Sequence, residues 1–255
     1  MADHRRLVQQ QFSAHAQNYV TSADHAQSDS LARLVALVQP QPQWRALDIA
    51  TGGGHTALAF APHVREVVAT DLTREMLLAA EAFIRARGSA NVSFRQADAA
   101  ALPFGDSEFD LVTCRVAPHH FPDCARFVRE MARVLRLRGV AVMVDNVVPD
   151  DALAARHINA FEKLRDPSHH WAYTRGDWLG FFALAGLAVT HDEIFRKARD
   201  FDNWAAMMSV NERRQAQLRV MLAQAPASAR AALAPEFAGE AVKFYLTEVL
   251  LIARK

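Results

Sequence analysis

The sequence predicts an α/β protein with a doubly wound, mostly parallel sheet of seven strands. Short apolar runs alternate along the chain with segments whose apolar residues recur at helical spacing. The runs are apolar nearly throughout, which is typical of parallel strands buried on both faces. Strands that alternate with helices in this way imply right-handed crossovers within one parallel sheet.

The first part of the chain carries five of the predicted strands. We expect them at residues 45–50, 66–70, 92–96, 109–114 and 140–144. Helices are expected at residues 55–61, 74–87 and 123–135, and Gly88 ends the second of them. An earlier helix, whose apolar face includes Leu31 and Leu34, ends before Pro40.

The alternation of strands and helices changes after Val148. Helical patterns cover residues 150–164, 178–185 and 201–225, and strands are expected at 189–195 and 243–253. Segments 150–177 and 201–240 are expected to form a cap over the carboxyl edge of the sheet, where open α/β sheets bind ligands. We therefore expect one domain with a helical N-terminal part (1–39), a ligand-binding α/β core (40–149) and a third part (150–255) that adds the last strands and the cap.

The composition is that of an ordinary globular protein, with 51% hydrophobic and 22% charged residues. The 29 basic and 28 acidic residues give a net charge of +1, which argues against a protein that chiefly binds nucleic acid. No apolar run approaches the ~18 residues of a membrane span, and the first residues lack the apolar core of a secretory signal. Cys114 and Cys124 suit a reducing compartment. We expect a cytoplasmic protein without a membrane span or a nucleic-acid partner.

A glycine-rich turn, ALDIATGGGHT (46–56), joins the first strand to the next helix. Its small residues let the backbone approach a ligand closely, and the helix start offers unpaired N–H groups. By itself such a turn fits a dinucleotide, a nucleoside or no ligand. Asp48, four positions before the first glycine, would repel a pyrophosphate but favours a cationic nucleoside such as S-adenosylmethionine.

Two further acids follow the next two strands. Asp71 ends the second strand, 71 − 48 = 23 positions after Asp48, where its carboxylate can accept hydrogen bonds from both hydroxyls of a ribose. Asp98 follows the third strand and can accept a hydrogen bond from the amino group of an adenine. Each acid alone also fits a helix N-cap or a solvated loop. Together with the glycine turn, the three acids predict a nucleoside site at the carboxyl edge of the sheet.

Four segments carry a resemblance to a known family: LDIATGGG, VVATDLTREML, ADAAALPFGDSEFDLVTCR and REMARVLRLRGVAVMVD. They cover about residues 45–145 and resemble the class I S-adenosylmethionine-dependent methyltransferases, in the small-molecule branch of the ubiquinone and menaquinone biosynthetic enzymes (methyltransferase type 11). The resemblance implies the Rossmann-like methyltransferase fold with an antiparallel last strand. It also implies S-adenosyl-L-methionine as the methyl donor and S-adenosyl-L-homocysteine as the product.

The same resemblance implies a set of cofactor-binding residues. They are Asp48, Ala50, Gly52, Gly54 and Arg115 around the methionine part, Asp71 on the ribose, Leu72, Met76, Asp98 and Ala99 around the adenine, and Tyr19 and His25 from an N-terminal lid. Apart from the resemblance, His120 is expected as a contact on the cofactor side, because the next helix begins near it. A polar helix outside the site is an equal alternative for His25. The family usually has glycine where Ala50 stands, but the added methyl group is small and binding is expected to survive.

Methyl transfer is an in-line displacement at a carbon activated by positive sulfur, so the protein must align the nucleophile and exclude water. A base is needed only for an alcohol, a phenol or a protonated nitrogen. His119 and His120, after the fourth strand, are the candidates for this base; packing under the cap or contact with the cofactor is the alternative. Asp145-Asn146 would orient an acceptor or cap the next helix. No metal-binding spacing accompanies the histidines, so no metal site is expected.

The leading hypothesis is methyl transfer to O, N or C of a small apolar or aromatic molecule by a monomer or homodimer. Five aromatic residues could line a pocket for it: Phe161, Trp171, Tyr173, Phe181 and Trp204. The first alternative is an NAD-dependent oxidoreductase, which predicts no acid at Asp48 and gives no reason for Asp98. The second is a nucleoside-binding protein that catalyses nothing.

Overall fold

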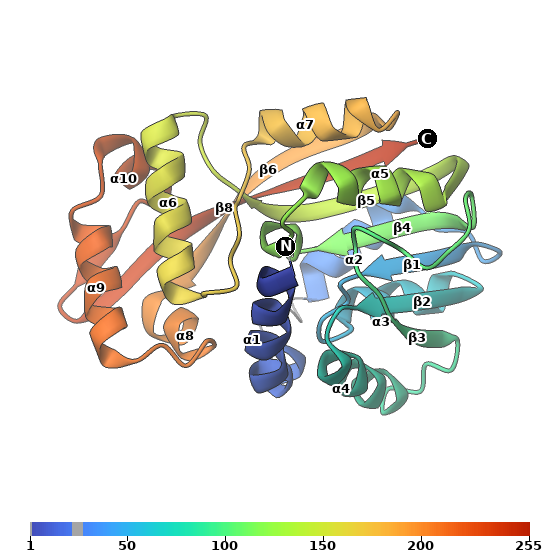
Figure 1. Ribbon diagram of the computed structural model, residues 1–255, viewed down its shortest axis with the longest axis horizontal. Coiled ribbons are helices and arrows are strands. Elements are labelled where there is room, and N and C mark those ends of the chain that lie inside the picture. The colour runs from blue at the N-terminus through green and yellow to red at the C-terminus, as the bar shows by residue number, and fades with distance from the viewer. Residues whose placement is uncertain (1, 22–27) are drawn as a thin grey trace.

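The computed structural model describes residues 2–21 and 28–255. Its sheet has the strand order β3-β2-β1-β4-β5-β8-β6, and a short strand β7 pairs with β8 outside this order (Figure 1). Strands β1 to β5 are parallel, whereas β8 runs antiparallel to β5, β6 and β7. The strands are β1 (Arg45–Ile49), β2 (Glu66–Asp71), β3 (Val92–Gln96), β4 (Phe109–Arg115), β5 (Leu135–Val147), β6 (Ala188–Asp200), β7 (Glu236–Ala238) and β8 (Ala241–Arg254).

The fold class predicted from the sequence is confirmed, with one strand more than expected. The added strand β7 forms a hairpin with β8 through Gly239, whose φ of 63° suits a tight turn. Strands β5, β6 and β8 are longer than their apolar runs because their ends carry polar residues. The cap packs on the first half of β8, and its helix α8 (Phe201–Ala206) also contacts β6.

Helices cover both faces of the sheet. They are α1 (Ala2–Thr21), α2 (Ser28–Val38), α3 (His55–Phe60), α4 (Arg74–Arg85), α5 (Cys124–Val134), α6 (Ala152–Arg165), α7 (Arg175–Leu184), α8 (Phe201–Ala206), α9 (Glu212–Ala223) and α10 (Ala227–Leu233), with short 3-10 turns η1 (Ala61–His63) and η2 (Pro118–His120). Helices α5 and α7 pack on one face, and α2, α3 and α4 on the other. Leu47 and its neighbour Ala46 belong to these opposite cores, as the alternation of side chains along a strand requires.

The cap has its own apolar core, formed by α6, α8, α9, α10 and the first half of β8 (Figure 1). The prediction of a single helix over residues 201–225 is wrong, because the segment forms two helices, α8 and α9. Each begins after a polar residue that caps it. Asp200 accepts a hydrogen bond from Asn203 N at the start of α8, and Asn211 accepts one from Arg214 N at the start of α9. Pro226 then precedes α10.

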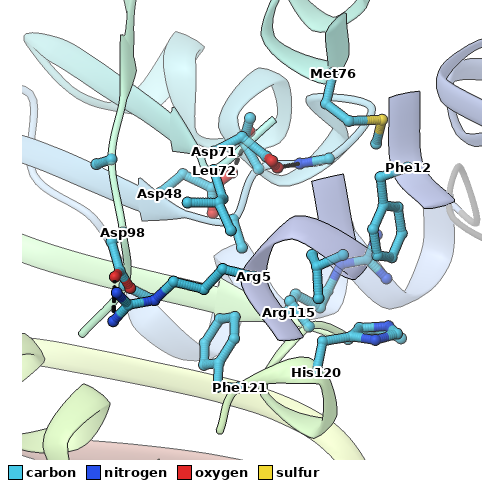
Figure 2. A pocket seen from close by; sticks show the side chains of 18 of the residues that line it. Arg5, Phe12, Asp48, Asp71, Leu72, Met76, Asp98, Arg115, His120 and Phe121 are labelled. Carbon is cyan, nitrogen blue, oxygen red and sulfur yellow. Dashed lines mark hydrogen bonds and ion pairs between the residues drawn. The ribbon is translucent and has the colours of Figure 1, made fainter. Parts of the chain in front are cut away.

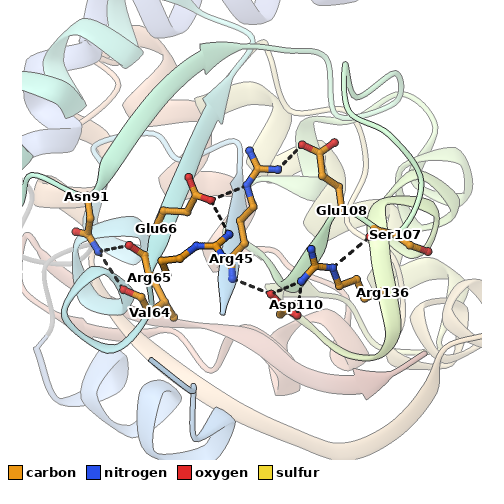
Figure 3. Close-up of polar contacts among 9 residues, drawn as sticks. All are labelled: Arg45, Val64, Arg65, Glu66, Asn91, Ser107, Glu108, Asp110 and Arg136. Atoms are coloured by element: carbon orange, nitrogen blue, oxygen red, sulfur yellow. Dashed lines mark hydrogen bonds and ion pairs between the residues drawn. The ribbon is translucent and has the colours of Figure 1, made fainter. Parts of the chain in front are cut away.

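Ion pairs tie the strands together at the amino edge of the sheet (Figure 3). Arg45, the first residue of β1, pairs with Glu66 Oε1 at 3.0 Å and with Glu108, and its backbone N–H donates to Asp110 Oδ2 at 2.8 Å. Arg136 of β5 also pairs with Asp110. These contacts link the starts of β1, β2, β4 and β5, and the loops at the opposite, carboxyl edge build the candidate site.

Candidate functional site

A cavity, here called the first cavity, opens at the carboxyl edge of the sheet where β1, β2 and β4 end (Figure 2). Its empty volume, which includes space open to solvent, is about 1060 Å³. The first turns of α1 close it from the side opposite the sheet. The predicted cofactor-binding residues that line it are Asp48, Ala50, Gly52, Asp71, Leu72, Met76, Asp98, Ala99, Arg115 and His120.

Asp48 organises the glycine turn from within. Its Oδ2 accepts a hydrogen bond from the Thr51 hydroxyl and its Oδ1 one from the Thr113 hydroxyl, both at 2.6 Å. Burial raises the pKa of Asp48, although these two hydrogen bonds oppose the shift. Each carboxylate oxygen of Asp48 already accepts a hydrogen bond from a threonine hydroxyl. Asp48 therefore stabilises the conformation of the glycine turn, and its carboxylate adds negative charge to the first cavity.

Asp71 lies where β2 ends, and both of its oxygens accept backbone hydrogen bonds. Oδ1 accepts from Thr73 N at 2.9 Å and Oδ2 from Gly52 N at 3.1 Å. Burial raises the pKa of Asp71 to about 6, against the effect of these bonds. A carboxylate oxygen has a second lone pair. Asp71 can therefore still accept bonds from two hydroxyls of a ligand.

Asp98 has a partner that the sequence did not reveal. Its Oδ1 accepts a bond from Ala100 N at 2.9 Å, and its Oδ2 pairs with Arg5 of α1 at 2.6 Å (Figure 2). Phe12, also from α1, meets the ring of His120 edge-on with the centroids 5.0 Å apart. The signal that could have found this face is the spacing of His4, Val8 and Phe12, which recur every four residues as one side of a helix does.

The two residues predicted for the lid stay untested. Tyr19 lies in α1, but its side chain is outside the described part of the chain, and His25 lies outside the described residues. The N-terminal residues that the structure does place against the first cavity lie nearer the start of α1.

Gly54, also in the predicted set, is not among the residues that line the first cavity, and its role there stays a prediction. A Cβ atom at this position would lie 2.9 Å from Ile84 Cδ1 and 3.1 Å from Ala80 Cβ, and φ is 84°. Gly54 therefore lets α3 pack closely on α4. Ala50, in contrast, does line the cavity and has a φ of 53°, a strained value for a residue with a side chain.

A second cavity lies between the carboxyl edge and the cap. It is lined by Val116, His119, His120, Asn146, Glu162, Arg165, Asp166, Arg199, Trp204, Met207 and Leu246. Val116 and His120 line both cavities, so they form the wall between them. Val116 has a φ of 54°, which is rare for a β-branched residue and is often found at functional sites.

The two adjacent histidines, His119 and His120, have different surroundings and opposite pKa shifts. Nδ1 of His119 lies 2.6 Å from Asp145 Oδ1, and both side chains are buried. Burial alone would lower the pKa of His119, but the charge and the hydrogen bond of Asp145 outweigh it and the pKa is raised. Burial, followed by the charge of His119, lowers the pKa of His120 to about 3, so His120 is neutral at neutral pH.

Asp145 is not a helix cap, which settles one alternative left open by the sequence. Helix α6 is capped by Asp151, which accepts a hydrogen bond from Ala154 N at 2.8 Å. Asp145 instead contacts Nδ1 of His119, a residue that lines the second cavity. An imidazole supported by a carboxylate in this way is a common general base.

Four of the five aromatic residues predicted for an apolar pocket do not line either cavity. Among the described residues around the two cavities, Trp204 is the one member of the set that lines either. Phe161 stacks on Trp204 within the core of the cap, at 4.9 Å between centroids. Tyr173 and Phe181 pack around Trp178 beside α5. These four residues therefore give no support to the prediction of an apolar acceptor.

Comparison with known proteins places the chain in a family. The methyltransferase domain family matches residues 47–143, which hold the glycine turn and the three acids. The "uncharacterized methyltransferase YcgJ" of Bacillus subtilis is 36% identical over 219 residues, or 86% of this chain and 87% of that protein. The chain belongs to the methyltransferase family.

Similarity to solved structures agrees with this assignment. The crystal structure of YcgJ matches with a TM-score of 0.86 and 34% identity, over 89% of this methyltransferase and 98% of YcgJ. The protein BH2331 of Bacillus halodurans matches with a TM-score of 0.85 and 38% identity, over 89% and 99% of the two chains. Demethylmenaquinone methyltransferase of Geobacillus kaustophilus is 35% identical over 108 residues, 41% of this chain and 46% of that enzyme. The fold is that of the class I methyltransferases, which favours this activity over the oxidoreductase alternative.

Two further observations apply to the described ranges, residues 2–21 and 28–255. No helix there is long and apolar enough to cross a membrane. No group of three histidine, cysteine, aspartate or glutamate side chains in the same ranges is placed to hold a metal ion.

Proposed function

We propose that this methyltransferase uses S-adenosyl-L-methionine, bound in the first cavity, to methylate a small molecule bound in the second. The observation that carries the proposal is the convergence of Asp48, Asp71 and Asp98, from three successive strands, on one cavity. Carboxylates favour a ligand that bears an ammonium and a sulfonium and no phosphate. The position of the second cavity beneath the cap supports a small acceptor over a polymer.

The residues around the first cavity fit this cofactor. Asp71 has free lone pairs for the two ribose hydroxyls, and the apolar side chains of Leu72 and Met76 lie beside it for the adenine (Figure 2). Asp98 and Ala99 would take the edge of the adenine, with Asp98 sharing its carboxylate between Arg5 and the ligand. S-adenosyl-L-methionine, when bound, supplies a methyl group activated by the neighbouring positive sulfur.

The wall between the cavities would align the two reactants. Val116 and the neutral ring of His120 line both cavities and would exclude water from the path of transfer. His119, held by Asp145, would take a proton from the acceptor at Nε2. In this proposal His120 helps to align the reactants and to exclude water, and His119 is the general base.

Thermal unfolding with S-adenosyl-L-homocysteine, NAD or adenosine tests the cofactor. A ligand present at about 100 times its Kd stabilises the folded state by about 2.7 kcal/mol. We expect this gain with S-adenosyl-L-homocysteine and not with NAD; stabilisation by NAD alone would overturn the proposal. His119→Ala should abolish turnover and keep cofactor affinity, whereas His120→Ala should lower both, because only His120 lines the first cavity.

A further inference from the structure

The second cavity is polar, although it lies inside the protein. Seven of the eleven residues that line it carry polar or charged side chains. Its empty volume, again including space open to solvent, is about 520 Å³, roughly half that of the first cavity. A cavity of this size and character fits a small polar molecule.

Glu162 of α6 has a buried side-chain oxygen that lacks a hydrogen-bond partner and that a ligand could satisfy. It lines the second cavity and is 4% exposed, and its Oε1 atom has no hydrogen-bond partner among the described residues. Burial raises the pKa of Glu162, although Arg165, His119 and Arg199 pull it down. A buried oxygen without a donor costs free energy unless a ligand supplies one.

A second residue of the lining is in the same condition. Asn146 Oδ1, at the end of β5, is also buried without a hydrogen-bond partner in the described part of the chain. Both atoms are hydrogen-bond acceptors in the orientation that the structure gives them. The matching ligand therefore carries hydrogen-bond donors.

The lining of the second cavity carries both signs of charge. Its two carboxylates, Glu162 and Asp166, lie with two arginines, Arg165 and Arg199. Arg199 is also paired with Glu248 at 3.4 Å. An ammonium group on a ligand can therefore meet a carboxylate here, and Glu162 is the one whose Oε1 has no hydrogen-bond partner among the described residues.

We propose that the second cavity binds a small aliphatic amine through Glu162, and that the nitrogen of this amine is the atom methylated. The proposal rests on the proposed function, because the methyl donor would occupy the first cavity. It replaces the expectation of an apolar or aromatic acceptor.

The reaction balances with the groups at hand. His119 Nε2 takes one proton from the ammonium and frees the lone pair of the nitrogen. That pair forms the new N–C bond as the C–S bond breaks, and the electrons of the C–S bond stay on sulfur, which becomes a neutral thioether. The positive charge thus moves from sulfur to the methylated nitrogen, where Glu162 stabilises it.

Paired substrates test the chemistry. Ethanolamine, putrescine and β-alanine are each compared with the analogue in which every amine is replaced by a hydroxyl: ethylene glycol, butane-1,4-diol and 3-hydroxypropanoate. Release of S-adenosyl-L-homocysteine is measured, and its binding is measured separately by calorimetry. We expect turnover with at least one member that carries the amine, and at least a tenfold lower rate when the hydroxyl replaces the reacting nitrogen.

Variants test the residue. In Glu162→Gln the KM for the amine should rise at least tenfold while the affinity for S-adenosyl-L-homocysteine stays within twofold; Glu162→Asp should recover part of the loss. Glu212→Gln, which removes an exposed carboxylate at the start of α9, is the matched control and should change neither value. Unchanged KM in Glu162→Gln, equal turnover of the hydroxyl analogues, or no turnover of any amine by a chain that binds S-adenosyl-L-homocysteine would overturn the inference. Failure to bind S-adenosyl-L-homocysteine would instead count against the proposed function.

Discussion

The pair of His119 and Asp145 gives the sharpest prediction, through the substitution Asp145→Asn. The side chains of both residues are buried, at 8% and 0% exposed, with 2.6 Å between Nδ1 and Oδ1. Asparagine keeps the shape and one acceptor oxygen but removes the charge. What is lost is therefore the attraction between a carboxylate and an imidazolium in a place that water does not screen.

The magnitude follows from that geometry. A hydrogen bond to a charged group contributes about 1.5–3 kcal/mol, and we expect Asp145→Asn to lower the free energy of unfolding by this amount. For a chain of this length the loss corresponds to a fall in Tm of about 3–12 °C. Because Asp145 raises the pKa of His119, the contribution is fully present below about pH 6.5, the value in the unfolded chain. It is lost as the pH rises through the pKa of the folded state.

Thermal unfolding at one mildly acidic and one mildly alkaline pH measures this effect. Asp202→Asn is the control, since Asp202 forms an ion pair with Arg219 at 2.5 Å but is 63% exposed. The control should lose at most about 1 kcal/mol at either pH. An Asp145→Asn loss that equals the control, or that is the same at both pH values, would refute the argument. So would a wild-type His119 whose ring titrates below the usual pKa of histidine in an NMR experiment.

Three further predictions concern the first cavity and its loop. Asp71→Ala should weaken binding of S-adenosyl-L-homocysteine by about 1.5–3 kcal/mol, and binding by the wild type should fall as the pH drops below about 6 and Asp71 becomes protonated; calorimetry that shows neither change would contradict the assigned role. Ala50→Gly should raise Tm by relieving a φ of 53°, a gain of about 1 kcal/mol, and a lower Tm would mean that this backbone is not strained. Gly54→Ala should cost about 2 kcal/mol, because its Cβ would meet Ile84 Cδ1 at 2.9 Å with φ at 84°; an unchanged melting curve would contradict that packing.

Local patterns were enough to predict the parallel core and the place of the first cavity. Apolar runs fall on strands, and parallel strands bring their carboxyl ends to one edge, so Asp48, Asp71 and Asp98 meet without further information. The cap was predicted less well. The break near Asn211 depends on a single capping hydrogen bond, which a helical pattern of apolar residues does not reveal.

The sequence by itself determined the fold, the family and the three acids that point to the methyl donor. Only the tertiary structure decided that His119, and not His120, is hydrogen-bonded to a carboxylate, because Asp145 is 26 positions away and no periodicity connects the two. It also decided that the second cavity is polar. Glu162, Arg199 and His119 come from a helix, a strand and a 3-10 turn far apart in the chain, and they share a cavity only because the cap folds over the edge of the sheet.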